Sequence, residues 1–127
     1  MQLTLKLMEG HYGVCRLEPK SIIPTWCQQG EFFSVTKTMD ELSIICLETY
    51  IPEDVQVEKE WCILKIVGPL DFSLVGILSK ISQLMAECKI SIFALSTYDT
   101  DYILIKQAKI TEAIQALKTA GYHIISS

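Results

Sequence analysis

The chain has 127 residues, which is enough for one compact domain or for two half-size units that share a core. Half of the residues are apolar and a fifth are charged, a globular composition that argues against disorder. The net charge of −4 and the scattered single lysines disfavour nucleic acid as a partner. No apolar run approaches the roughly 18 residues that cross a bilayer, and the first residues lack the pattern of a signal peptide. We therefore expect a cytoplasmic protein with no membrane partner.

The cysteines are dispersed along the chain. Their number is odd, no pair has the CxxC spacing, and each lies in an apolar or strand-like context: Cys15, Cys27, Cys46, Cys62 and Cys88. A disulfide framework or a zinc site would need clustered ligands. We expect reduced, buried thiols and neither a metal nor a cofactor.

The first half of the chain has the pattern of short strands joined by turns. Leucines that alternate with polar residues predict a strand over 3–7, and a second short strand is expected over 14–17. A short helix is expected over 22–28, and strands 32–38 and 42–48 should form a hairpin.

Residues 50–59 form the expected boundary between two units. They contain Pro52, several charged residues and only weak periodicity, with some strand character near Val55 and Val57. This composition is typical of a linker. We expect an N-terminal unit over 1–57 and a C-terminal unit over 58–127.

The second half has a clearer pattern. Residues 61–67 are apolar at almost every position, which predicts a strand that is buried on both faces. A helix should follow, starting near Asp71 or Ser73, because the next apolar residues have helical spacing. This stripe consists of Leu74, Ile77, Leu78, Ile81, Leu84, Met85 and Cys88. Strands are then expected over 90–98 and 102–106.

A last helix and strand complete the predicted unit. Thr111 should cap a helix that turns Ala113, Ile114 and Leu117 inward, and Gly121 should end it in a left-handed conformation. A final short strand is expected over 122–125. The order βαββαβ is the ferredoxin-like pattern, an α+β fold with an antiparallel sheet and helices on one face.

The two halves of the chain echo each other. The segment 33–45 resembles the segment 93–104 when a gap of one residue is allowed. Together with a shared order of elements, this similarity indicates a duplication whose first copy has eroded.

The segment 61–105 resembles an ACT domain. The matching motifs are LKIVGP at 64–69, FSLVGIL at 72–78 and ISIFALSTYDTDYIL at 90–104. The last motif is similar to the ACT domains of aspartate kinases and of the arginine-sensing CASTOR proteins. The stretch EFFSVTKTMDELS at 31–43 resembles the partner ACT-like half of small bacterial proteins in this subgroup.

This resemblance implies a fold of two tandem ACT-like units, the first of them degenerate. It also implies a non-catalytic regulatory module that binds an amino acid at an interface between ACT units, pairs as a homodimer and acts on a protein partner that the sequence does not identify. The usual Pro-Gly turn before the first ACT helix reads PLDFS at 69–73, and this departure leaves the identity of the ligand open.

A free amino acid needs backbone N–H groups for its carboxylate, oxygen atoms for its ammonium group and a shaped pocket for its side chain. The turn over 68–73 leads into a helix start and can offer the N–H groups, whereas acidic residues at a hairpin tip can offer the oxygens. By resemblance to the arginine sensors, Ser91 and Ile92 present main-chain groups and Asp101 reaches the ligand amine. The expected ligand-binding residues are Gly68, Pro69, Leu70, Asp71, Phe72, Ser73, Gly76, Ser91, Ile92, Ser96, Thr97, Asp99 and Asp101.

Each of these positions also has a purely structural explanation. Asp99 and Asp101 are ordinary turn residues, and Ser96 and Thr97 are common at strand ends. Gly76 can reflect close packing of the helix on the sheet.

Enzyme chemistry has little support in the sequence. His11 and Cys15 are four residues apart, but no third residue is apparent that would orient them, and no phosphate-binding, hydrolase or metalloprotease motif occurs. We therefore expect a protein that is not an enzyme. The alternative to a ligand-binding module is a structural module that only mediates dimerisation or another protein interaction.

Overall fold

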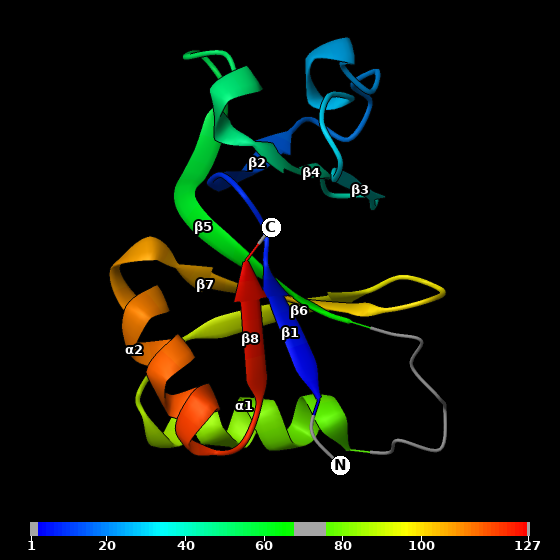
Figure 1. Ribbon diagram of the computed structural model, residues 1–127. Helices are drawn as coiled ribbons and strands as arrows, with labels where there is room; N and C mark the ends of the chain where they lie inside the picture. Colours follow the sequence, from blue (N-terminus) through cyan, green and yellow to red (C-terminus); the bar gives the residue numbers. More distant parts are fainter. Residues whose placement is uncertain (1–2, 68–75, 127) are drawn as a thin grey trace. The chain divides into compact units, whose positions relative to one another are not determined.

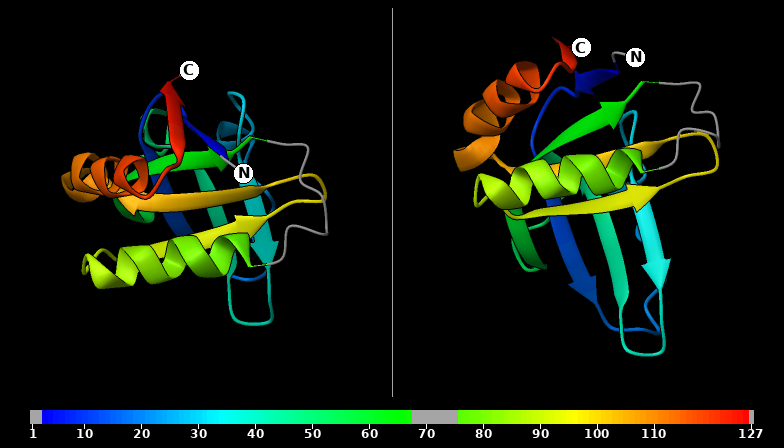
Figure 2. Two further views of the ribbon diagram at one scale, coloured as in Figure 1. Left: turned by 60° about the horizontal axis from the view of Figure 1, so that its bottom comes forward. Right: turned by 90° about the horizontal axis from the view of Figure 1, so that it is seen from below.

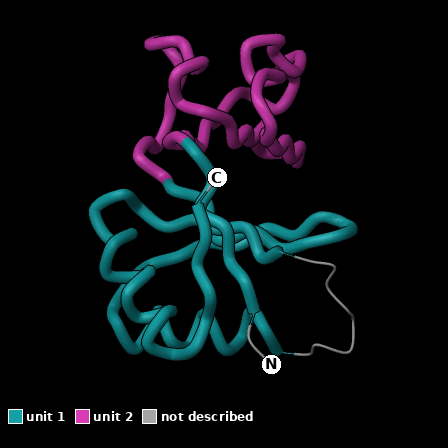
Figure 3. Tube along the Cα trace, viewed as in Figure 1, with its two compact units in different colours: residues 1–9, 62–127 teal, residues 10–61 magenta. Residues whose placement is uncertain are grey.

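The computed structural model describes residues 3–67 and 76–126. The chain forms two compact units, shown in different colours in Figure 3. The larger unit contains residues 1–9 and 62–127, and the smaller unit contains residues 10–61. This division differs from the boundary expected after residue 57, because the first strand of the chain pairs with strands of the second half.

Apart from the first strand of the chain, the larger unit has the element order that the sequence predicted (Figure 1). Its elements are β1 (Thr4–Leu7), the second part of β5 (Gln56–Ile66), α1 (Ile77–Glu87), β6 (Ile92–Ser96), β7 (Asp101–Lys106), α2 (Gln107–Thr119) and β8 (His123–Ser126). From β5 onward the order is βαββαβ, which confirms the α+β, ferredoxin-like prediction.

The sheet of the larger unit contains one strand more than the ferredoxin-like pattern requires. Its strand order is β6-β7-β5-β1-β8, so that β1 lies between β5 and β8. Leu5 of β1 is opposite Ile66 in an antiparallel pair and opposite Ile124 in a parallel pair. The expectation of a wholly antiparallel sheet was therefore wrong at β1 and β8, because an inserted strand that is antiparallel to β5 must run parallel to β8.

Both helices pack on one face of this sheet (Figure 2). The fully buried core of the unit joins sheet residues with residues of α1 and α2: Leu5, Leu64, Ile66, Ile81, Met85, Ile90, Ile103, Ile105, Ala113 and Leu117. The apolar stripe predicted for α1 is confirmed at Ile81 and Met85, and Ile77, Leu78, Leu84 and Cys88 pack around them. Leu74, the first member of the predicted stripe, lies outside the described residues.

The second helix begins five residues earlier than predicted. α2 follows β7 directly with Lys106 as its N-cap, and Thr111 is an exposed residue inside the helix. The prediction that Thr111 caps the helix was wrong because Ile110 already belongs to the face that packs on the core. The end of α2 is as predicted: Gly121 has φ of 100°, and the Tyr122 amide donates to the Leu117 carbonyl at 3.0 Å, which is a Schellman cap.

The smaller unit is built from strands. It contains β2 (Tyr12–Leu17), β3 (Ser34–Lys37), β4 (Leu42–Leu47) and the first part of β5, in the order β3-β4-β2-β5. Across residues 10–61, all of which are described, the only helical elements are two 3-10 turns, η1 (Thr25–Cys27) and η2 (Glu48–Tyr50). The helix predicted over 22–28 is therefore wrong, because Pro24 is extended and the chain makes one short turn after it.

The predicted linker is partly a strand. β5 begins at Gln56 and pairs with β2, with Val57 opposite Cys15. The register between β2 and β5 shifts between Tyr12 and Val14, which is a β-bulge. Near this shift Glu60 has φ of 69°, and its amide donates to the Glu48 carboxylate at 3.0 Å. The charged residues of this segment make it look like a linker in the sequence, although its backbone forms a strand that pairs with β2.

Three thiols lie in the core of the smaller unit. Cys15, Cys27 and Cys46 are each at most 1% exposed and pack with Leu42 and Ile44. A hydrogen bond with Cys15 and burial together raise the pKa of the Cys46 thiol, while the same bond lowers the pKa of Cys15. The prediction of buried thiols is confirmed for four of the five cysteines, and Cys88 is half-buried.

Candidate functional site

The tip of the β6–β7 hairpin carries the acidic residue on which the sequence analysis centred. Ser96 and Asp101 are opposite each other in the two strands, and the Ser96 hydroxyl donates a hydrogen bond to Oδ1 of Asp101. The Thr97 amide donates to the Thr100 carbonyl at 2.8 Å, which closes the turn over residues 97–100. The Thr97 hydroxyl also accepts the Thr100 amide at 3.3 Å.

Asp101 lies on the helix-covered face of the sheet. Side chains alternate along a strand, so Asp101 shares its face with Ile103 and Ile105, which belong to the core beneath the helices. The hairpin tip, the end of β5 and the first turn of α1 all lie at the same end of this unit (Figure 2). The hairpin that carries Asp101 therefore ends on the side of the unit where α1 begins, and the Ser96 hydroxyl donates to the Asp101 carboxylate.

The other predicted residues fall into three groups. Ser91 and Ile92 lie at the opposite end of β6 from Ser96, roughly 13 Å away by the usual rise of a strand. Gly76 precedes α1 in a left-handed conformation with φ of 85°, so it lies before the helix and not one turn inside it, as we had expected. The segment Gly68, Pro69, Leu70, Asp71, Phe72 and Ser73 lies outside the described residues.

The structure therefore brings together four of the predicted residues at the hairpin tip: Ser96, Thr97, Asp99 and Asp101. Thr97 closes the turn with its own hydroxyl, and Asp99 is exposed in the turn. Both therefore have the structural role that their residue types allow. Asp101, which is only partly exposed and accepts a hydrogen bond from Ser96, remains the candidate for ligand contact.

Thr100 belongs to this tip and was missed by the sequence analysis. Its side chain is buried, with 8% exposure, although the preceding residue, Asp99, is exposed. The Thr100 hydroxyl donates to the Ile66 carbonyl at 2.5 Å. A threonine in a turn is common, and the sequence held no signal that its hydroxyl reaches a strand 34 residues away.

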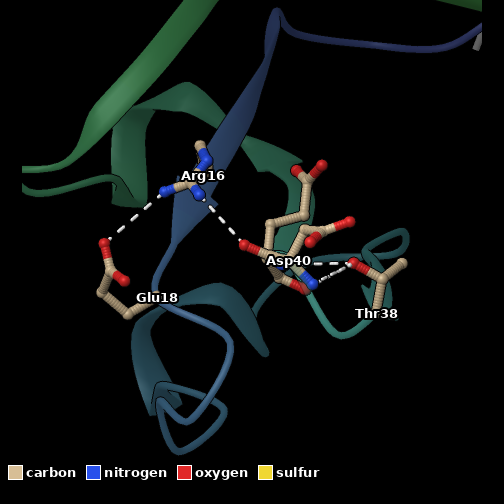
Figure 4. Close-up of polar contacts among 5 residues, drawn as sticks. Arg16, Glu18, Thr38 and Asp40 are labelled. Atoms are coloured by element: carbon tan, nitrogen blue, oxygen red, sulfur yellow. Dashed lines mark hydrogen bonds and ion pairs between the residues drawn. The ribbon is translucent and has the colours of Figure 1, made fainter.

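The smaller unit contains a turn of the same design, shown in Figure 4. The Thr38 amide donates to the Glu41 carbonyl at 2.9 Å, and the Thr38 hydroxyl accepts the amides of Asp40 and Glu41, each at 3.1 Å. Arg16 of β2 donates to the Asp40 carbonyl at 3.0 Å and lies 3.6 Å from the Glu18 carboxylate. This hairpin tip is thus fastened to β2 by a cation.

The registers of the two hairpins align without a gap. Lys37 is opposite Leu42 at the end of β3 and β4, as Ser96 is opposite Asp101 at the end of β6 and β7. The one-residue gap that the sequence comparison required was therefore wrong. In the smaller unit the position of Asp101 is taken by Leu42, which is 1% exposed, so that this position is acidic in the larger unit only.

Among residues 3–67 and 76–126, no group of three or more histidine, cysteine or acidic side chains is arranged to hold a metal ion. None of the helices in 3–67 and 76–126 is long and apolar enough to cross a membrane.

Comparison with known proteins places this geometry in a family. A model of the ACT domain matches residues 56–119, and a second family model, which describes an N-terminal domain, matches residues 10–54. A comparison with proteins of curated function gave no match.

Several solved structures are similar over nearly the whole chain. A protein of Agobacterium tumefaciens is 35% identical with a TM-score of 0.94, and the match covers 100% of this chain and 95% of that one. A Vibrio cholerae protein of unknown function is 18% identical with a TM-score of 0.77 over 93% of this chain and 89% of that one. The regulatory subunit of aspartate kinase from Thermus thermophilus is 12% identical with a TM-score of 0.61, over 87% and 93% of the two chains. The last two likenesses, below 25% identity, concern the fold alone. The ACT model spans half of the 127 residues, and on this ground the chain belongs to the ACT-domain family.

Proposed function

We propose that this chain is a non-catalytic regulatory module that binds a free amino acid at the tip of the β6–β7 hairpin. The observation that carries the proposal is the Ser96–Asp101 pair, which holds a carboxylate on the helix-covered face at the end where α1 begins. The fold neighbours described as regulatory parts of aspartate kinase support a regulatory role over an enzymatic one.

The proposed site offers complementary partners to the two ends of an amino acid. Asp101 uses Oδ1 to accept the Ser96 hydroxyl, which leaves further lone pairs for an ammonium group. The first amides of an α-helix have no partner within the helix, and together with the positive dipole end of α1, an eleven-residue helix, they suit a carboxylate. A zwitterion can therefore lie between the hairpin tip and the helix start.

A thermal-shift screen against the twenty amino acids tests the proposal. A ligand present at 100 times its dissociation constant should add about 2.7 kcal/mol of stability. The Asp101→Asn variant keeps the shape of the side chain but removes its charge, and it should weaken binding by roughly 2 to 5 kcal/mol. Asp99→Asn is the matched control, since Asp99 is an exposed turn residue and its variant should bind like the parent.

If no amino acid stabilises the parent, the regulatory-sensor proposal is wrong. If the Asp101→Asn and Asp99→Asn variants bind equally well, an amino acid binds elsewhere on the molecule and the assignment to the hairpin tip is wrong.

A second candidate function is a pure interaction module. Among the described strands, β6 and β8 are the outer strands of the larger unit's sheet, each paired on one side only. Open edges of this kind can pair with a second copy of the chain, and such a homodimer should bury more than about 1,000 Å². Light scattering would report twice the chain mass if β6 or β8 pairs between copies, and a monomer at high micromolar concentration would argue against this candidate.

The cellular location follows from the same proposal. The five cysteines are thiols outside any disulfide, which suits a reducing compartment, and we place the module in the cytoplasm.

A further inference from the structure

The Thr100 side chain makes a hydrogen bond that is not needed to close its own turn. The equivalent position of the smaller unit's turn is Glu41, and that turn closes through the same amide-to-carbonyl bond, at 2.9 Å compared with 2.8 Å. A hydroxyl at this position is therefore unnecessary for the hairpin itself. The Thr100 hydroxyl instead donates to the carbonyl of Ile66, which is the last residue of β5.

This bond joins the acidic hairpin tip to a central strand. Asp101 follows Thr100 directly, and β5 pairs with both β1 and β7 within the sheet. Thr100 is 8% exposed, so water competes poorly for its hydroxyl, and the bond is correspondingly strong. The tip is thereby fixed to the end of β5, whose last residue is fully buried, while Tyr98 in the same turn is 92% exposed.

We propose that Thr100 is a positioning residue, which holds the Ser96–Asp101 pair at the end of β5 in the geometry that receives the ligand ammonium group. The inference rests on the proposed function, since it concerns the same site. Thr100 does not itself contact the ligand in this account. Because it restricts Asp101 before the ligand arrives, it lowers the conformational entropy that is lost on binding.

The experiment compares three substitutions at this position. Thr100→Val replaces the hydroxyl with a methyl group of similar size, and Thr100→Ser keeps the hydroxyl. Thr100→Ala leaves space for a water molecule at the Ile66 carbonyl, and it serves if the valine variant does not fold. Glu41→Gln changes the equivalent turn of the smaller unit and is the control.

Two readouts are measured for each variant. The first is hydrogen exchange at the Thr97 and Thr100 amides, which needs no ligand. The second is affinity for each of the twenty amino acids by calorimetry. We expect Thr100→Val to exchange faster at these amides and to bind roughly tenfold more weakly, the loss of about 1.4 kcal/mol that one buried hydrogen bond can cause. Thr100→Ser should restore both values, and Glu41→Gln should change neither.

The outcomes separate this inference from the proposed function. If the parent binds an amino acid and Thr100→Val binds it equally well, Thr100 is a structural tie only, the inference is overturned and the proposed function stands. If Thr100→Ser fails to restore affinity, the hydroxyl is not the reason and the inference is again overturned. If the parent binds none of the twenty, the proposed function is wrong, and the positioning role falls with it.

Discussion

Thr38 and Thr97 occupy the same position in two hairpin turns of the same design. Each amide donates to the carbonyl three residues onward, and each hydroxyl accepts an amide of its own turn. The residue after each turn differs, however, because Leu42 is in the core of the smaller unit and Asp101 is at the surface of the larger one. The two halves thus share their turn chemistry, but the position after the turn is acidic in the larger unit and apolar in the smaller one.

The number of ligands per chain follows from this difference. We expect binding to saturate at one amino acid per chain, since Leu42 offers no charge where Asp101 offers one. Leu42→Ala should lower the free energy of unfolding by roughly 2 to 5 kcal/mol through a core cavity, and it should leave the stoichiometry at one. Calorimetry measures the number of sites directly, and two equivalent sites per chain would contradict this assignment.

The α1 core contact can be tested by a single truncation. Ile81 is 1% exposed and lies among residues of the sheet and of α2. Ile81→Ala should lower the free energy of unfolding by roughly 2 to 5 kcal/mol, measured by urea denaturation. Ser82→Ala changes the exposed neighbour on the same helix and should stay within about 0.5 kcal/mol of the parent. Equal effects of the two substitutions would contradict the packing of α1.

The buried thiols predict a loss of stability in alkaline solution. The pKa of Cys46 is raised by its hydrogen bond with Cys15 and by burial, so the folded chain retains a proton that the unfolded chain releases above about pH 8.5. Since the native state then binds more protons, the free energy of unfolding falls as the pH rises past that value. The stabilising contribution is fully present below it.

Urea denaturation at about pH 7.5 and about pH 10 measures this dependence. Cys46→Ala should have a lower free energy of unfolding than the parent at the lower pH. From the lower pH to the higher one, however, its free energy of unfolding should fall by less than that of the parent. Cys88→Ala is the control, because Cys88 is only half-buried and lies in the larger unit. A Cys46→Ala variant with the same pH dependence as the parent would show that this thiol is not the cause.

Much of the larger unit could be predicted from the sequence. The α1 stripe and the β6–β7 hairpin depend on local spacing, which is visible in one segment at a time. The insertion of β1 could not be predicted, because its pairing with β8 depends on a strand more than a hundred residues away. The start of β5 was missed for a related reason, since its exposed charged residues look like a linker until β2 is placed beside them.

In the candidate site, too, some features could be predicted from local sequence and others depend on how distant segments pair. Asp101 and Ser96 could be identified as polar residues at a hairpin tip, but their hydrogen bond depends on the exact register of the two strands. Thr100 was missed because the sequence does not reveal the direction of a turn hydroxyl. The strand before the β3–β4 turn was aligned one residue out of register, because the sequence comparison aligned Phe33 with Phe93, whereas the strand pairing aligns Ser34 with Phe93.

The most direct test of the central claim is a calorimetric titration of the full chain with each of the twenty amino acids, repeated with Asp101→Asn and Asp99→Asn. We predict saturable heat for at least one amino acid at one site per chain. Binding should be lost or weakened by roughly 2 to 5 kcal/mol in Asp101→Asn and unchanged in Asp99→Asn. The absence of heat with all twenty, or parent-like binding by Asp101→Asn, would contradict the claim that this hairpin tip is an amino-acid site.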